Sequence, residues 1–106
     1  MILFKPEHIP MVKNGIKTQT RRKGKPRWKI GSIHQAKENF KKGSKPFAHI
    51  EILAVRREPL GSITEADAKA EGYSSVEEYK KVFQRIYGDW NPDEVVNVVD
   101  FRRVMK

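Results

Sequence analysis

The chain has 106 residues, which suits one ordinary domain over residues 1–106 and is too short for two separate cores. It contains no cysteine, and its histidines (His8, His34 and His49) show no metal-ligand spacing, so zinc fingers, thiol catalysis and iron–sulfur clusters are excluded and we expect no metal or cofactor. The formal net charge is +9, and no stretch is apolar for long enough to form a signal peptide or cross a membrane, so we expect a soluble cytoplasmic protein with no membrane partner.

The first elements of the chain are a short strand and a helix. Residues 2–4 are apolar and predict a strand, and a helix is expected from about Glu7 to Asn14. Gly15 ends this helix, because glycine tolerates the left-handed conformation. Residues 17–22 contain two threonines and no structure breaker, so they predict a strand, and residues 23–29 predict a basic loop.

The middle of the chain predicts two further strands separated by a polar turn. A strand is expected over residues 33–37 and a turn over residues 38–46. Residues 47–57 form the clearest strand, because apolar side chains occupy both of its faces from Ile50 to Val55. We therefore expect this strand to be buried and paired along both edges.

Two helices follow, and each has a recognisable start. Thr64 can cap the first helix, which has acids in its first turn and should end near Gly72. Ser74 or Ser75 caps the second helix, which Gly88 ends. The second helix carries apolar side chains at helical spacing: Val76, Tyr79, Val82, Phe83, Ile86 and Tyr87. We interpret this stripe as core packing and not as a binding groove.

A last strand is expected over residues 95–101, so the chain contains four to six short strands with helices inserted at two places. Strands and helices do not alternate as they do in proteins with a parallel sheet. The fold class is therefore α+β, and a small, mostly antiparallel β-barrel with helical insertions fits the pattern best. A ferredoxin-like sandwich is the alternative fold.

The charges are segregated along the sequence. Residues 11–45 carry twelve Lys and Arg against one acid, whereas residues 64–94 carry eight acids against four bases. Segregated positive charge favours binding to phosphates, although a solvated lysine-rich surface without a partner is the alternative. The segment 17–29 is therefore expected to face RNA or a nucleoside. Its candidate binding residues are Lys17, Thr18, Thr20, Arg21, Arg22, Lys23, Lys25, Arg27, Trp28 and Lys29.

The motif Gly15-Ile16-Lys17-Thr18-Gln19-Thr20-Arg21-Arg22 resembles the G-x-K-T-x-T-x-R signature of ASCH domains. The turn at Ile30-Gly31, the apolar strand over 50–55 and the helical pair from Ile63 to Gly88 also resemble that family, so the resemblance covers almost the whole chain. It implies a PUA-like β-barrel. It also implies binding to RNA, because ASCH domains are generally proposed to bind RNA.

The chain is also similar to the bacterial N4-acetylcytidine amidohydrolases, and this resemblance implies an alternative function as an enzyme. Their proposed catalytic Lys, Thr and Glu correspond to Lys17, Thr20 and Glu71. A lysine whose pKa is lowered by neighbouring cations or by burial can deprotonate a threonine hydroxyl. The carboxylate of Glu71 can pass a proton to the leaving amine or hold the base by hydrogen bonds.

This alternative has a geometric requirement. Residues three apart in a regular strand point to opposite faces, so Lys17 and Thr20 converge only if a turn or bulge separates them. In an unbroken strand, Thr18, Thr20 and Arg22 would share a face and form the better binding set. Without chemistry, Glu71 is a surface acid at a helix C-terminus, where the helix dipole disfavours it; this indicates that another contact keeps it there.

Trp28 lies among cations on the predicted basic loop. A tryptophan in this setting can stack on an unpaired base while its neighbours hold phosphates, and the alternative is a hydrophobic plug under the barrel rim. A ribonuclease is the third activity that we consider. It needs a general acid and a general base, and the histidines are too scattered in sequence to indicate such a pair. The predicted partners are therefore RNA or a modified nucleoside.

Overall fold

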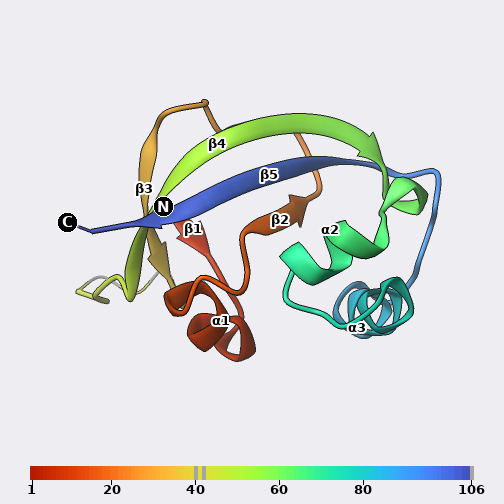
Figure 1. Ribbon diagram of the computed structural model, residues 1–106, viewed down its shortest axis with the longest axis horizontal. Helices are drawn as coiled ribbons and strands as arrows, with labels where there is room; N and C mark the ends of the chain where they lie inside the picture. Colours follow the sequence, from red (N-terminus) through yellow and green to blue (C-terminus); the bar gives the residue numbers. More distant parts are fainter. Residues whose placement is uncertain (40, 42, 106) are drawn as a thin grey trace.

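The computed structural model describes residues 1–39, 41 and 43–105. Its strands form one five-stranded sheet with the order β1-β3-β4-β5-β2 (Figure 1). The strands are β1 (Ile2–Leu3), β2 (Gln19–Arg22), β3 (Ile33–Lys37), β4 (Ala48–Pro59) and β5 (Val95–Val104). β1 pairs in parallel with β3, and the other three pairings are antiparallel.

The sheet curves into a half-barrel in which β4 and β5 arch over β2, α1 and α2 (Figure 1). The expected α+β architecture with inserted helices is confirmed, but the sheet formed by the described strands is mixed and does not close. β1 and β2 are its two edges and do not pair with one another within the described part of the chain. No helix of the described residues is long and apolar enough to cross a membrane.

The helices lie on the concave side of this sheet and follow their capping signals. They are α1 (Ile9–Lys13), preceded by a 3-10 turn η1 (Pro6–His8), then η2 (Leu60–Ser62), α2 (Glu65–Ala70) and α3 (Val76–Tyr87). Thr64 forms a capping box with Asp67 at the start of α2. Of the two candidate serines, Ser75 caps α3. The expected single helix over 7–14 is instead a 3-10 turn followed by a short α-helix.

The expected strand over residues 17–22 is wrong in its first half, because β2 begins at Gln19. The backbone N–H groups of Ile16 and Lys17 both donate to the carbonyl of Met11, at 2.8 and 3.0 Å. The N–H of Thr18 donates to the carbonyl of Ala70 at 2.7 Å. The N–H groups of residues 16–18 are therefore bound to α1 and α2, and of their carbonyls that of Thr18 accepts from the N–H of Phe101 in β5 at 2.9 Å, so contact with the sheet begins only at Thr18.

The strand expected over 47–57 is β4, and it is paired on both edges, with β3 and β5, as predicted. A register shift between Ile52 and Ala54 marks a bulge in its pairing with β5. At this bulge Leu53 is 46% exposed, so the expectation of burial on both faces is wrong at Leu53. A bulge bends its strand and turns a side chain away from the regular alternation, which accounts for the exposure.

Two hydrophobic clusters hold the fold together. The first lies under the barrel and comprises Ile2, Phe4, Val12, Ala36, Ile50, Ile52, Val99 and Phe101. The second joins η2, α2 and α3 to the first half of β5 and comprises Leu60, Ile63, Ala68, Tyr79, Phe83, Val96 and Val98. β5 contributes to both clusters, so it connects the barrel to the helical end of the molecule.

Candidate functional site

A cavity of about 260 Å³ opens beside the two edge strands of the half-barrel. Its lining comes from β1 and the residues after it, from β2 and Lys17 just before it, and from α3. Glu38 after β3, and Glu71 and Tyr73 after α2, complete it. The lining includes Lys17, Thr20, Arg22 and Glu71. With Arg21, which also lines it, the cavity brings five of the predicted site residues to one place.

The floor of the cavity contains a buried ion pair between Lys17 and Glu71. The Lys17 Nζ donates to Glu71 Oε1 at 2.6 Å and to the Glu71 carbonyl oxygen at 3.0 Å. The two side chains are only 2% and 3% exposed. Burial lowers the pKa of the Lys17 ammonium below its usual value, and the Glu71 carboxylate opposes this shift.

The local structure explains why an acid is tolerated at the end of α2. Glu71 is the C-cap residue of α2, where the helix dipole disfavours negative charge, and the ammonium of Lys17 compensates for it. Gly72 follows with φ of 99°, a conformation that reverses the chain and that other residues rarely adopt. Lys17 arrives at the same point because residues 16–18 are hydrogen-bonded to α1 and α2.

Thr20 and Arg22 form the second polar part of the cavity. The Arg22 Nε donates to Thr20 Oγ1 at 3.1 Å, so the hydroxyl hydrogen of Thr20 remains available to another acceptor. The Arg22 Nη2 donates to the carbonyl of Leu3 at 2.5 Å, and its guanidinium lies 5.3 Å from the centre of the Phe4 ring. Arg22 thus connects the edge strands β1 and β2, which do not pair directly.

Lys17 precedes β2 and does not belong to a regular strand, so the alternation that would separate it from Thr20 does not apply. Both residues line the same cavity. Among the described residues, however, their polar atoms bond to different partners: Lys17 to Glu71, and Thr20 to Arg22. Thr18 is exposed and is absent from the lining, so the alternative set of Thr18, Thr20 and Arg22 does not come together.

Arg21 also contributes to the lining, but its guanidinium is completely covered. It lies 3.3 Å from Asp67 Oδ2 and 3.4 Å from Glu58 Oε2. Gln19, on the same side of β2, donates to Asp67 at 3.2 Å and to Asp100 at 2.9 Å. These contacts attach α2 to the sheet, and so they fix the helix that ends at Glu71.

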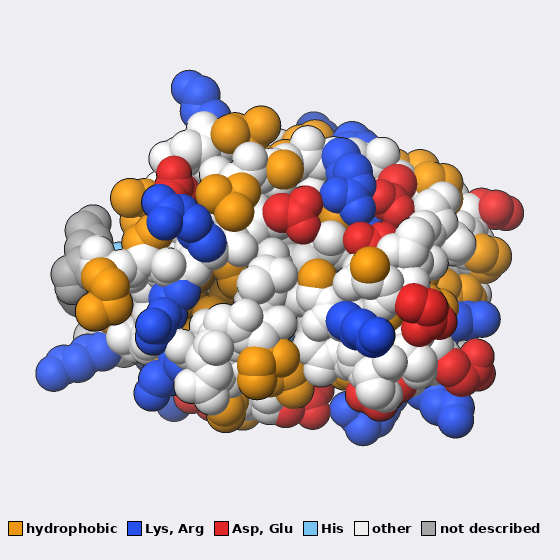
Figure 2. Space-filling model, viewed as in Figure 1, with side chains coloured by type: hydrophobic (Ala, Val, Ile, Leu, Met, Phe, Trp, Pro, Cys, Tyr) orange, Lys and Arg blue, Asp and Glu red, His pale blue; other side chains and the backbone are white. Residues whose placement is uncertain are grey.

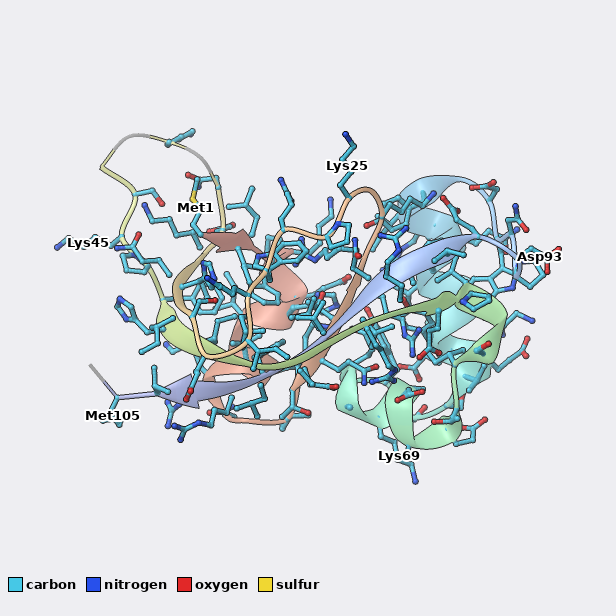
Figure 3. The ribbon with its side chains drawn as sticks, turned by 90° about the horizontal axis from the view of Figure 1, so that it is seen from above. Met1, Lys25, Lys45, Lys69, Asp93 and Met105 are labelled. Carbon is cyan, nitrogen blue, oxygen red and sulfur yellow. The ribbon has the colours of Figure 1, made fainter. Side chains whose placement is uncertain are left out.

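The residues of the basic loop differ in their exposure and in their partners. Lys23 pairs with Glu94 at 3.3 Å, and its Nζ lies 4.8 Å from the centre of the Tyr87 ring. Lys25, Arg27 and Lys29 are exposed, and the Lys25 side chain points outward from the loop (Figure 3). Trp28 is half-buried against the first hydrophobic cluster, which is the position of a plug and leaves part of its ring accessible.

The segregation of charge along the sequence persists in space. On the face shown in Figure 2, Asp and Glu side chains gather toward the end that carries α2 and α3, whereas Lys and Arg predominate at the opposite end. Within the described residues, no group of three potential metal-ligating side chains occurs.

Sequence reasoning missed one polar pair and one wall of the cavity. His8 Nε2 and Tyr73 Oη are 2.7 Å apart, and both residues line the cavity. The stripe of α3 is core only in part: Tyr79 and Phe83 are buried, but Tyr87 is 46% exposed, and it lines the cavity together with the side chains of Val82 and Ile86. The interpretation of the stripe as core alone is therefore wrong. No local signal marks His8, since its partner is 65 residues away.

The comparisons with known proteins agree with this architecture. A family model described as "ASCH domain" matches residues 2–105. No curated protein is detectably similar to the chain in sequence.

Three solved structures are similar in fold. The ASCH domain from Lactobacillus crispatus JV V101 has a TM-score of 0.72 at 16% identity, over 90% of this chain and 69% of that one. A protein from Enterococcus faecalis V583 has a TM-score of 0.69 at 24% identity, over 92% and 70%. A mutant ASCH protein from Zymomonas mobilis has a TM-score of 0.66 at 16% identity, over 95% and 66%. The chain belongs to the ASCH domain family.

Proposed function

We propose that the protein binds RNA or a nucleoside through the cavity around Lys17, Thr20, Arg22 and Glu71. The observation that supports this most strongly is the combination, in one small cavity, of a polar floor and an aromatic wall. Ligand pockets usually measure about 300–1,000 Å³, so a cavity of about 260 Å³ suits a group the size of one nucleoside better than a large cofactor.

The wall of the cavity suits a planar base. Tyr87 lines the cavity and is 46% exposed, and a base that displaces the Lys23 ammonium from its ring and stacks there gains about 1–3 kcal/mol. The exposed cations Lys25, Arg27 and Lys29 on the neighbouring loop supply positive charge for phosphates of a longer strand. The cavity would hold one base or nucleoside and the loop would hold the flanking backbone.

Binding is tested by calorimetric titration of the protein with cytidine, uridine, N4-acetylcytidine and a short single-stranded RNA. We expect saturable binding of at least one of these ligands and a loss of about tenfold or more in Thr20→Val, which removes the hydroxyl and keeps the side-chain shape. Thr18→Val is the matched control, because Thr18 is exposed outside the cavity. Unchanged affinity in Thr20→Val, or an equal loss in both variants, would contradict a binding site at this cavity.

An amidohydrolase acting on N4-acetylcytidine is the second candidate function. The observation that favours it is a lysine with a lowered pKa in the same cavity as a threonine whose hydroxyl hydrogen is available. Neutral Lys17 would accept the hydroxyl proton while Thr20 Oγ attacks the acetyl carbonyl carbon. The C–N bond would then break, and the amine would leave as cytidine after taking a proton delivered through Glu71. Water would release acetate from the acyl-threonine.

This activity is tested by measuring acetate release from N4-acetylcytidine. Lys17→Ala and Glu71→Ala should abolish turnover, and Thr20→Val should do so without disturbing the buried ion pair. Lys13→Ala is the control, because Lys13 is an exposed lysine on α1. If the unsubstituted protein binds N4-acetylcytidine but releases no acetate, the binding function stands and the enzyme is excluded.

A further inference from the structure

His8 and Tyr73 form a hydrogen-bonded pair that joins two walls of the cavity. His8 ends the 3-10 turn after β1, and Tyr73 lies in the connection between α2 and α3, two residues after Glu71. Their polar atoms are 2.7 Å apart, and both residues line the cavity. The residues assigned above to binding or catalysis do not include this pair.

The phenol of Tyr73 is held firmly in place. The His8 ring meets the Tyr73 ring edge-on, with centroids 5.8 Å apart, and Tyr79 meets it from another direction at 5.6 Å. Edge-to-face contacts of this kind favour one ring orientation. The Tyr73 hydroxyl is therefore oriented before any ligand arrives, which reduces the entropy lost on binding.

Both members of the pair are uncharged near neutral pH. Burial, together with the cations Lys17, Arg22 and Lys5, lowers the pKa of His8 to about 4. Burial, together with the acids Glu7 and Glu71, raises the pKa of Tyr73 above its usual value. The pair therefore offers a ligand hydrogen bonds without a net charge.

The hydroxyl of Tyr73 keeps a free position for a second hydrogen bond. If Tyr73 donates to His8 Nε2, its oxygen can accept from a ligand; if His8 donates, the phenolic hydrogen can be given to a ligand. The charged groups on the floor are already engaged, because Lys17 is bound to Glu71 and Arg22 to Thr20 and Leu3. The uncharged Tyr73 hydroxyl is thus a ready polar contact for the ligand.

We propose that Tyr73 is a specificity-determining residue that hydrogen-bonds an uncharged polar group, an amine, amide or carbonyl on a planar base, and that His8 is the residue that positions it. This inference rests on the proposed binding function. It adds that the polar edge of the base is recognised by hydrogen bonding to the uncharged pair of His8 and Tyr73, which lies outside the sequence motif.

The inference is tested by calorimetric titration of the full chain and its variants with cytidine, uridine and N4-acetylcytidine. Tyr73→Phe removes one hydroxyl and should weaken binding of the preferred nucleoside by about tenfold. His8→Phe should weaken it by a similar or smaller factor, and His8→Gln, which can still hydrogen-bond the phenol, should stay within about threefold of the unsubstituted protein. Thr18→Val is the control, because it removes a hydroxyl that is exposed outside the cavity, and it should stay within about twofold of the unsubstituted protein.

A thermodynamic cycle separates positioning from direct contact. Because His8 acts through Tyr73, the double variant His8→Phe with Tyr73→Phe should lose no more affinity than Tyr73→Phe alone. Additive losses would overturn the positioning role of His8. Affinity unchanged by Tyr73→Phe, in a protein whose binding is weakened by Thr20→Val, would overturn the inference and leave the proposed function intact. Absence of nucleoside and RNA binding by the unsubstituted protein would overturn both.

Discussion

The buried pair of Lys17 and Glu71 is the contact at which single residues determine both the stability and the chemistry of the site. Each side chain is almost completely excluded from water, so neither charge can be solvated if the other is removed. The same burial lowers the pKa of Lys17 and thereby brings its neutral, basic form closer to neutral pH. The burial of this ion pair therefore affects both the stability of the folded protein and the proposed chemistry.

We expect Glu71→Gln to lower the free energy of unfolding by about 3–5 kcal/mol, because it leaves the Lys17 ammonium buried without an opposite charge. The double variant Lys17→Met with Glu71→Leu should recover much of this loss. Urea unfolding measures both effects. Arg102→Ala is the control: Arg102 pairs with Glu51 at an exposed position, so its loss should cost less than about 1 kcal/mol. Equal costs for Glu71→Gln and Arg102→Ala would show that the buried pair has no special weight.

His8 should make the stability of the protein depend on pH. In the unfolded chain its imidazole takes up a proton near pH 6.5, whereas burial and the cations Lys17, Arg22 and Lys5 lower its pKa in the folded protein to about 4. The unfolded state therefore binds more protons between these values, and stability falls as the pH falls from about 6.5 to about 4. Above this range His8 contributes no pH dependence.

The size of this effect is about 1–2 kcal/mol once partial exposure of the ring to solvent is allowed for. It is measured as the free energy of unfolding at several pH values in the protein and in His8→Gln, which lacks the titrating group. The pH dependence of the variant should be weaker over this range. Identical curves would show that His8 is protonated equally in both states.

Among the elements, α2 is the one on which the site depends most. It has only six residues, too few to be stable alone, and it ends at Glu71. Its first turn is held by the capping box of Thr64 with Asp67, and Asp67 also contacts Gln19 and Arg21 on β2. The start of α2 is thus fixed to the sheet, and its end places the carboxylate of Glu71 next to Lys17.

Thr64→Ala should lower the free energy of unfolding by about 1 kcal/mol, because it leaves the backbone N–H of Asp67 without its side-chain acceptor. Thermal or urea unfolding measures the change. Ser62→Ala, two residues earlier at an exposed position in η2, should change stability by less than about 0.5 kcal/mol. Equal effects of the two substitutions would indicate that the cap contributes nothing specific.

At the scale of the whole molecule, the half-barrel leaves a gap between β1 and β2, and the cavity lies beside it. Arg22 spans the gap with one hydrogen bond to the carbonyl of Leu3. At the helical end of the molecule, α3 packs against β5 through the second hydrophobic cluster. The basic loop follows β2 directly in the sequence, and its exposed cations Lys25, Arg27 and Lys29 are not part of the cavity lining. In the function that we propose, the cavity would hold one base and the charged loop would hold the backbone.

The two parts should differ in their response to salt. About five phosphate contacts to single-stranded RNA give a slope near −3.5 in a plot of log affinity against log salt, which is roughly a hundredfold loss between 50 and 200 mM salt. Replacing Lys25, Arg27 and Lys29 together by alanine should reduce the slope to about −1.4, while affinity for an uncharged nucleoside stays within about twofold. Fluorescence anisotropy at four salt concentrations measures the slope. A slope unchanged by the triple substitution would exclude this loop from the RNA-binding surface.

Much of the secondary structure follows from neighbours along the chain. The caps at Thr64 and Ser75 and the paired strand β4 are set by residues within a few positions of one another, so they are readable in the sequence. The strand expected over 17–22 is confirmed over residues 19–22, and its first half was wrong for the opposite reason. Its first residues are taken by hydrogen bonds to Met11 and Ala70, and the partner in α2 is far away in sequence.

The α+β class, the order of most elements and the segregated charge could all be predicted from the amino-acid sequence, and its resemblance to ASCH domains indicated the candidates Lys17, Thr20 and Glu71. Which side chains meet depends on the folded chain. Lys17 bonds to a residue 54 positions away and His8 to one 65 positions away. Caps and periodicity depend on short-range hydrogen bonds and alternating faces, whereas burial, pKa shifts and the choice of partner arise once the chain has folded and water has been excluded.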